Sequence, residues 1–281
     1  MATPSPTPIL FDRQLLRARQ SRARRLGPAT FLLDRVSDDI DERLHAVLRD
    51  FAAVADLWTP MVTPGTHLTD RFQSITHIDL DDAAQERLPF APDSLDLVVS
   101  ALALQFVNDL PGVLAQIRRA LRPDGLLLAA MTGGDTLTEL RQAFAQAEAE
   151  LEGGVSPHVA PTADLRDLGA LLQRAGFALP VTDVDRFLVR YDNAFALMQD
   201  LRRMGATNVL VDRRRKPTRR ATLLRMAQIY AERFSDPDGR IRATFEIVWL
   251  SGWAPHESQQ QPLKPGSATA SLADAVKRVK P

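Results

Sequence analysis

The chain has 281 residues, of which 45% are hydrophobic and 25% are charged, and its 35 basic and 35 acidic side chains cancel. This composition is typical of a globular protein, and the absence of net charge gives no general attraction to nucleic acid or anionic lipid. The chain has no cysteine, which excludes disulfides, cysteine-ligated metal sites and a thiol nucleophile.

No apolar stretch approaches the roughly 18 residues that span a bilayer, so we expect a cytoplasmic protein without a transmembrane segment. Residues 1–9 are rich in Pro, Ser and Thr and are predicted to be disordered. Residues 10–50 are predicted to form a helical segment, in which the arginine-rich stretch Arg13–Arg25 is a solvated helix face. That stretch could instead belong to an organelle transit peptide, but the acidic residues that flank it are unusual in such peptides.

Residues 51–256 are predicted to form an α/β domain, and residues 257–281 a tail without periodicity. Phe51–Trp58 and Ser74–Leu80 indicate two short strands. The apolar run Leu97–Leu104 is typical of a strand that is covered on both faces, as in a parallel sheet.

The next segment predicts a crossover between parallel strands. Asn108 or Asp109 can cap a helix whose apolar residues recur at helical spacing. Pro123–Gly125 ends that helix, and Leu126–Met131 is a second apolar strand. Strand, helix and strand in this order favour one right-handed crossover unit.

The remainder of the domain continues the alternation. Thr136–Glu139 reads as a capping box that begins a long helix. The period-two pattern of Ile241–Trp249 predicts an antiparallel edge strand. Between them we expect three helices and one strand, at residues 163–176, 193–204, 221–234 and 181–191 respectively. The order predicts a doubly wound open sheet, whose ligands lie outside the carboxyl ends of the strands.

Leu88–Ser100, which reads LPFAPDSLDLVVS, resembles the segment that precedes the fourth strand in class I S-adenosylmethionine-dependent methyltransferases. Other segments resemble one branch of that family, which holds the biotin-synthesis malonyl-carrier methyltransferases and, closer still, the complex I assembly factor of the arginine-hydroxylase type. These segments are Leu102–Leu110, Leu121–Gly125, Gly133–Arg141, Gly153–His158, His256–Gln259 and Gly266–Thr269. The resemblance implies a Rossmann-like fold with a mostly parallel sheet and an antiparallel final strand.

The chain departs from this family where S-adenosylmethionine, the cofactor implied by the resemblance, should bind. Family members follow an acid at the end of the first strand with a glycine-rich turn, which lets the backbone approach the cofactor. Here Asp56 is followed by LWTPMVTPG, with a tryptophan, two prolines and one late glycine. The interval from Phe51 to Leu88 is also short, so we expect one strand–helix unit to be missing.

By this resemblance, four residues remain of the cofactor side: Asp56, Asp79, Ser100 and Ala101. Asp81 or Asp82 could substitute for Asp79. Two interpretations stay open. Either the chain binds S-adenosylmethionine in an unusual way, or it is a pseudoenzyme that keeps the substrate-facing half.

On the substrate side, the resemblance places Asp135, Thr136 and Trp249. His158 lies where these methyltransferases carry a lid over the substrate, and is a candidate catalytic residue as general base or orienting donor. His256 is a candidate of the same kind. The alternative for both is a loop histidine that hydrogen-bonds the backbone.

Two further sequence patterns do not predict a catalytic site. His77-Ile78-Asp79 has the H-x-D spacing of iron sites with two histidines and one carboxylate, but the α/β order differs from the fold of those proteins, so no metal is expected. Arg213–Lys216 with Arg219 and Arg220 is the densest charge cluster. Without interleaved aromatic residues it does not predict nucleic-acid binding, and a linker that docks a partner is favoured.

The resemblance therefore implies a methyltransferase-like protein that modifies or chaperones a quinone-module subunit during assembly of respiratory complex I. The expected partner is that protein subunit, and the expected location is a bacterial cytoplasm at the inner membrane. The alternative is an active S-adenosylmethionine-dependent methyltransferase that acts on a small-molecule or carrier-bound acid.

Overall fold

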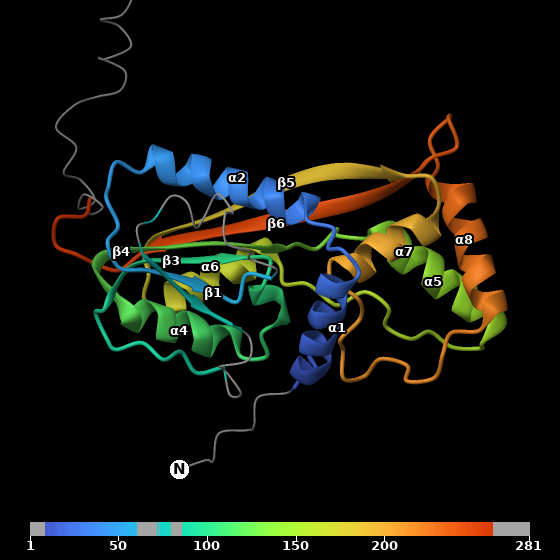
Figure 1. Ribbon diagram of the computed structural model, residues 1–281, viewed down its shortest axis with the longest axis horizontal. Helices are drawn as coiled ribbons and strands as arrows, with labels where there is room; N and C mark the ends of the chain where they lie inside the picture. Colours follow the sequence, from blue (N-terminus) through green and yellow to red (C-terminus); the bar gives the residue numbers. More distant parts are fainter. Residues whose placement is uncertain (1–8, 61–71, 73, 80–85, 261–281) are drawn as a thin grey trace, which may run out of the picture.

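The computed structural model describes residues 9–60, 72, 74–79 and 86–260, which form a six-stranded sheet with helices on both faces (Figure 1). In chain order the strands are β1 (Val54–Leu57), β2 (Ile75–Ile78), β3 (Leu95–Ala101), β4 (Leu121–Thr132), β5 (Ala178–Tyr191) and β6 (Ile241–Trp253). Their order across the sheet is β2-β1-β3-β4-β6-β5. The first four strands are parallel, whereas β6 runs antiparallel to β4 and β5.

This topology confirms the predicted Rossmann-like α/β fold with an antiparallel final strand. Between β2 and β3, the described residues 79 and 86–94 hold no further helix or strand. Much of the interval from Phe51 to Leu88, where the sequence predicts a missing strand–helix unit, lies outside the described residues. The predicted disordered segment 1–9 and tail 257–281 lie largely outside the described residues. No described helix is long and apolar enough to cross a bilayer.

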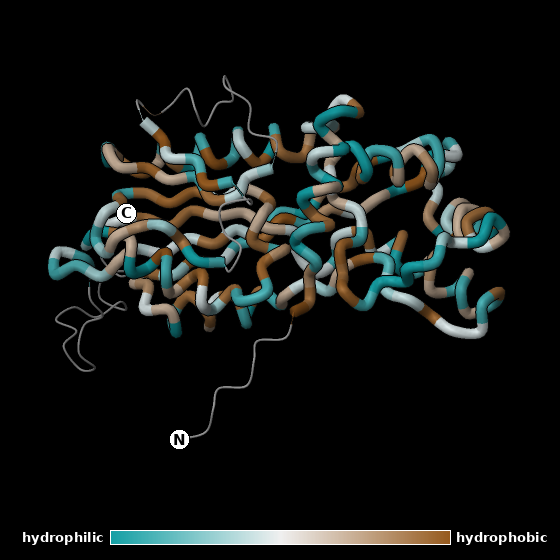
Figure 2. Tube along the Cα trace, turned by 60° about the horizontal axis from the view of Figure 1, so that its bottom comes forward, coloured by the Kyte–Doolittle hydropathy of each residue, from teal (hydrophilic) through white to brown (hydrophobic). Residues whose placement is uncertain are grey.

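Seven helices are described, together with a short 3-10 helix at Leu104–Phe106. They are α1 (Arg13–Arg25), α2 (Phe31–Ala46), α4 (Leu110–Ala120), α5 (Thr138–Leu151), α6 (Leu165–Arg174), α7 (Ala194–Arg203) and α8 (Arg220–Phe234). Figure 2 shows the strands largely in hydrophobic colours, while the helices carry hydrophilic stretches.

The sheet separates two apolar clusters. On β3, Val98 packs in the cluster that holds α4 and α6, whereas Leu97 and Val99 pack in the cluster that holds α2, α5, α7 and α8. Successive residues of a strand point to opposite faces, so both faces of β3 are covered. This is the arrangement that its continuous apolar sequence predicts.

The crossover from β3 to β4 also forms as expected. The Asp109 side chain caps α4 by accepting a hydrogen bond from the Gly112 amide at 2.9 Å. β4 begins earlier than predicted, at Leu121, and an irregularity in its register with β3 accommodates the Pro123–Gly125 turn sequence.

The predicted capping box at Thr136 and Glu139 is wrong. The residue that precedes α5 is Leu137, in a left-handed conformation with φ of 55°. The Thr136 hydroxyl instead donates to the Glu246 carbonyl and accepts from the Glu246 amide, at 3.0 and 3.1 Å. The Glu139 carboxylate accepts from the amide and hydroxyl of Thr244. Both side chains bind β6, because that strand passes beside the start of α5.

The prediction that the final strand lies at an edge is also wrong. β6 lies between β4 and β5, and β5 forms the edge. The alternating polar residues of β6 suggested one solvated face, but Thr244 is buried and its hydroxyl is satisfied by Glu139. Thr244 is polar, but it is buried together with its partner Glu139. It therefore gives β6, which is covered on both faces, the alternating pattern of an exposed strand.

Candidate functional site

The carboxyl ends of β1 and β3 bring Asp56, Ser100 and Ala101 together. Asp56 is buried and accepts a hydrogen bond from the Thr59 hydroxyl at 2.5 Å. That hydroxyl in turn accepts from the Ala101 amide at 3.0 Å, and the Ser100 hydroxyl donates to the Leu57 carbonyl at 2.9 Å. These polar groups are therefore satisfied by one another, which holds the turn after β1 against β3.

Two further residues lie near this turn. The Asp56 carboxylate is 3.2 Å from Nδ1 of His77 on β2. This hydrogen bond favours the imidazolium and raises the pKa of His77, while partial burial opposes the shift. Asp79, placed on the cofactor side from sequence, follows β2 directly and is exposed. Its suggested substitutes, Asp81 and Asp82, lie outside the described residues.

Trp58 stands two residues after Asp56, where the resemblance would place the first glycine of the turn. Its φ of 61° lies in the region that glycine adopts without cost, and its side chain is 3% exposed. Its amide donates to the Ile78 carbonyl at 3.0 Å, and the guanidinium of Arg13 lies 5.3 Å from the ring centroid. The ring therefore fills the space beside β1 instead of leaving the backbone accessible.

The described residues at the carboxyl end of β1 are closely packed. A small cavity lined in part by Pro60, Leu102 and Phe106 has about 50 Å³, which is space for only a few water molecules. Asp56 has protein partners, and the buried ring of Trp58 lies directly after β1. The rest of the predicted turn, including Gly65, lies outside the described residues.

A larger cavity of about 280 Å³ lies at the carboxyl end of β4. Thr132 from the end of β4 and Thr136 beyond it form part of its wall, and His158 lies in the loop that follows α5. The wall is mostly apolar and includes Leu140, Phe144, Leu201 and Phe245. The structure thus brings together two of the residues that sequence placed on the substrate side, Thr136 and His158.

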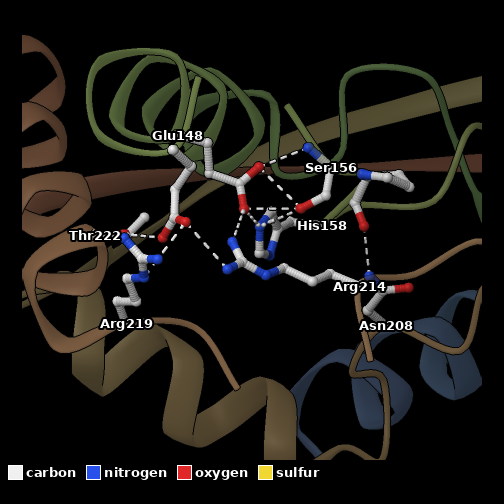
Figure 3. Close-up of polar contacts among 9 residues, drawn as sticks. Glu148, Ser156, His158, Asn208, Arg214, Arg219 and Thr222 are labelled. Atoms are coloured by element: carbon white, nitrogen blue, oxygen red, sulfur yellow. Dashed lines mark hydrogen bonds and ion pairs between the residues drawn. The ribbon is translucent and has the colours of Figure 1, made fainter. Parts of the chain in front are cut away.

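His158 is held in place by a buried carboxylate from α5 (Figure 3). Its Nε2 lies 2.8 Å from Oε1 of Glu148, whose side chain is 1% exposed. The amide and hydroxyl of Ser156 donate to the same carboxylate at 2.6 and 2.8 Å. The imidazole stacks on Phe144 with ring centroids 3.8 Å apart and planes 8° from parallel. The ring is therefore fixed both in position and in orientation.

The surroundings of Glu148 keep it ionised. Burial by itself raises its pKa, but hydrogen bonds from His158 and Ser156 outweigh burial and hold the pKa below its ordinary value. Arg214 adds a positive charge 3.8 Å away and also pairs with Glu152 at 3.1 Å. A carboxylate at Nε2 favours the tautomer protonated there, which leaves Nδ1 of His158 as an acceptor.

The remaining residues predicted from sequence lie elsewhere. Asp135 is exposed and pairs with Arg186 at 3.1 Å. Trp249 is buried beneath α2, where the guanidinium of Arg43 lies 4.2 Å from the ring centroid. His256 is exposed after β6, with Nδ1 2.6 Å from the Ser258 hydroxyl. None of these three is among the described residues that line the cavity.

Sequence reasoning missed Glu148, which reads as an ordinary acid on a long helix. It also did not predict that Arg214 reaches Glu148, because the charge cluster reads as a solvated linker. Within the described residues, no group of three histidine, aspartate or glutamate side chains could hold a metal ion. His77, from the H-x-D pattern, pairs with Asp56.

Comparison with known proteins finds a matching domain family. Residues 44–129 match the model of the methyltransferase domain family. The YcgJ protein of Bacillus subtilis, a solved structure, aligns with a TM-score of 0.48 and 14% identity over 76% of this chain and 97% of its own. The domain match, the sheet order and the antiparallel final strand define a class I methyltransferase-like protein.

Relatives with higher sequence identity show to which family within this class the chain belongs. Mitochondrial arginine-hydroxylase NDUFAF5 is 38% identical in Rattus norvegicus and 37% identical in Homo sapiens, in each case over 95% of this chain and 84% of the relative. The malonyl-acyl-carrier-protein O-methyltransferase of Xylella fastidiosa is 44% identical over 60% of this chain and 55% of its own. The chain belongs to the arginine-hydroxylase NDUFAF5 family.

Proposed function

We propose that this protein is an assembly factor of respiratory complex I that chaperones a protein subunit of the quinone module without using S-adenosylmethionine. Membership of the NDUFAF5 family supports the assembly role. The observation that carries the rest is a contrast within one fold. Asp56, Trp58 and Thr59 pack together in the described start of the turn after β1, whereas a cavity lies beside β4. A pseudoenzyme that retains the substrate side would have this contrast.

In this proposal, the cavity receives one side chain of the subunit. Its apolar wall favours the burial of carbon atoms, and burying a side chain the size of leucine contributes about 1.5 to 3 kcal/mol. Nδ1 of His158, fixed through Glu148 and Phe144, would accept a hydrogen bond from the bound segment. Asp135, which is exposed next to Thr136, would contribute to the rim of the site.

The proposed location is a bacterial cytoplasm, where the protein would meet complex I at the inner membrane. The proposed binding role does not require a cofactor. The named relatives are hydroxylases of arginine; we propose that this chain keeps the capacity to hold a segment of its partner.

A second function has support from sequence identity with the malonyl-acyl-carrier-protein O-methyltransferases. In that case the chain would transfer a methyl group to a small-molecule or carrier-bound acid. This function requires S-adenosylmethionine to bind, and therefore requires the turn after β1 to open.

Co-purification from the native host tests the proposal. Tagged protein should capture a quinone-module subunit, and Ala160→Trp, which fills the cavity, should abolish capture. Asp56→Asn is the control, because it alters the former cofactor side and should leave capture unchanged. Failure of the unmodified protein to capture any quinone-module subunit, or capture only after S-adenosylmethionine is added, would contradict the proposal.

A further inference from the structure

Beside the cavity, α1 and α7 lie next to one another (Figure 1). An open groove of about 630 Å³ lies between them. On α1 and its C-cap, the lining residues are spaced three and four apart, which places them on one side of the helix. On α7 the lining residues show the same spacing. The lining residues of the two segments are Arg19, Arg22, Leu26, Phe195, Met198, Gln199, Arg202 and Arg203, and Thr207 completes the groove.

The helices approach closely at one end of this groove. Gly205, with φ of 73°, follows α7, and a Cβ added there would lie 3.0 Å from the Cα of Gln20 on α1. The groove also adjoins the cavity, because Arg19, Met198 and Thr207 line both. A ligand in the groove therefore lies directly beside the candidate functional site.

The positive charge of the groove is poorly compensated. Four arginines line it, and no aspartate or glutamate is found among its described lining residues. Arg203 is engaged, since it donates to the Gly27 carbonyl at 2.7 Å and lies 3.6 Å from Asp200. Nε of Arg22, in contrast, is buried and has no hydrogen-bond partner in the described part of the chain.

Arg19 shows the effect of this crowding. Burial lowers its pKa, and the neighbouring charges of Arg22 and Arg213 lower it further, while Asp12 offsets part of the shift. An anion in the groove would relieve this repulsion. Because arginine presents a planar fork of donors, it binds carboxylates through paired hydrogen bonds.

The groove also exposes carbon surface. Leu26 and Phe195 are 49% and 44% exposed, at opposite helices of the groove. A partner that offers only charge would leave these side chains without contact. The surface is thus complementary to a ligand that carries anionic and apolar groups together.

We propose that this arginine groove binds an acidic segment of the partner protein, with its carboxylates on the arginines and a neighbouring apolar side chain directed to the cavity. The inference rests on the proposed function, since it describes the partner of the same site. The overall neutrality of the chain and the apolar residues of the groove favour an acidic peptide over nucleic acid.

Fluorescence anisotropy with a synthetic peptide tests the groove separately from the assembly role. The probe is a short labelled peptide in which glutamates flank one leucine, compared with the same peptide carrying glutamines. The glutamate peptide should bind the full protein and weaken with added salt. The double variant Arg22→Gln/Arg202→Gln should bind it at least about tenfold more weakly.

The control is Arg166→Gln/Arg174→Gln, which removes two exposed arginines from α6 and should bind like the unmodified protein. Equal affinity for both peptides, no binding of the glutamate peptide, or equal binding by the double variant would overturn the groove assignment. If the peptide binds as expected but no quinone-module subunit is captured, the groove stands and the assembly role fails. If the subunit is captured equally by the double variant, the groove assignment fails and the assembly role stands.

Discussion

Nε2 of His158 lies 2.8 Å from the carboxylate of Glu148, which is almost fully buried on α5. His158 lies ten positions after Glu148, and the intervening segment ends the helix and turns back over it. This relationship gives the loop a fixed histidine at the wall of the cavity. The loop's geometry therefore depends on one carboxylate.

Glu148→Gln should lower the free energy of unfolding by about 2 to 3 kcal/mol, because charge-assisted hydrogen bonds to a buried group are the stronger class. Urea unfolding measures this loss. Glu150→Gln on the same helix is the control, since Glu150 pairs with Arg225 at the surface and such pairs contribute little. Equal effects of the two substitutions would show that Glu148 does not anchor the loop.

The pair of His77 and Asp56 predicts a dependence of stability on pH. The hydrogen bond from Asp56 raises the pKa of His77 in the folded state, so the stabilisation is complete below the ordinary histidine pKa of about 6.5 and is lost as pH rises through the folded-state value. Unfolding of the unmodified protein and of His77→Gln should therefore differ more at about pH 5.5 than at about pH 8.5. A difference that is constant or grows with pH would refute this coupling.

Trp58→Ala tests whether the turn after β1 is part of the core. Its ring is 3% exposed, and truncation of such a residue costs about 3 to 5 kcal/mol. Denaturant unfolding should show this loss, with a smaller loss for Trp58→Phe. A nearly neutral Trp58→Ala would mean that the ring is free to move aside, so that the turn could open around a ligand.

Substitution of Thr136 distinguishes a strand contact from a helix cap. Aspartate is a good N-cap residue, but its carboxylate cannot donate to the Glu246 carbonyl as the hydroxyl does. Thr136→Asp should therefore destabilise the protein by about 1 to 3 kcal/mol. Thr138→Val should cost less, because the Thr138 hydroxyl only accepts a bond from exposed Gln142. Full stability of Thr136→Asp would support the capping box after all.

The sequence predicted the elements whose signals are local. The apolar spacing of α4 lies within one helix, and Asp109 caps it from the adjacent position. Thr136 and Glu139 carry an equally local signal, yet their partners Glu246 and Thr244 lie more than a hundred residues away. Hydrogen bonds to β6 therefore form in place of the predicted capping box.

The residues of the candidate site could likewise be predicted only in part. The resemblance directed attention to His158 and Thr136, which line the cavity. It could not reveal Glu148, whose burial depends on how the following loop folds back. It also could not predict that Arg22 and Arg202 line the same groove, because the sequence shows no relation between two helices so far apart in the chain.

Calorimetric titration of the purified protein with S-adenosylmethionine, after a check for ligand carried through purification, most directly tests the claim that the cofactor side is closed. We predict no binding at millimolar ligand, and no change in that result for Asp56→Ala. Micromolar binding by the unmodified protein, lost at least tenfold (about 1.4 kcal/mol) in Asp56→Ala, would contradict the claim and identify a rebuilt cofactor site around Trp58.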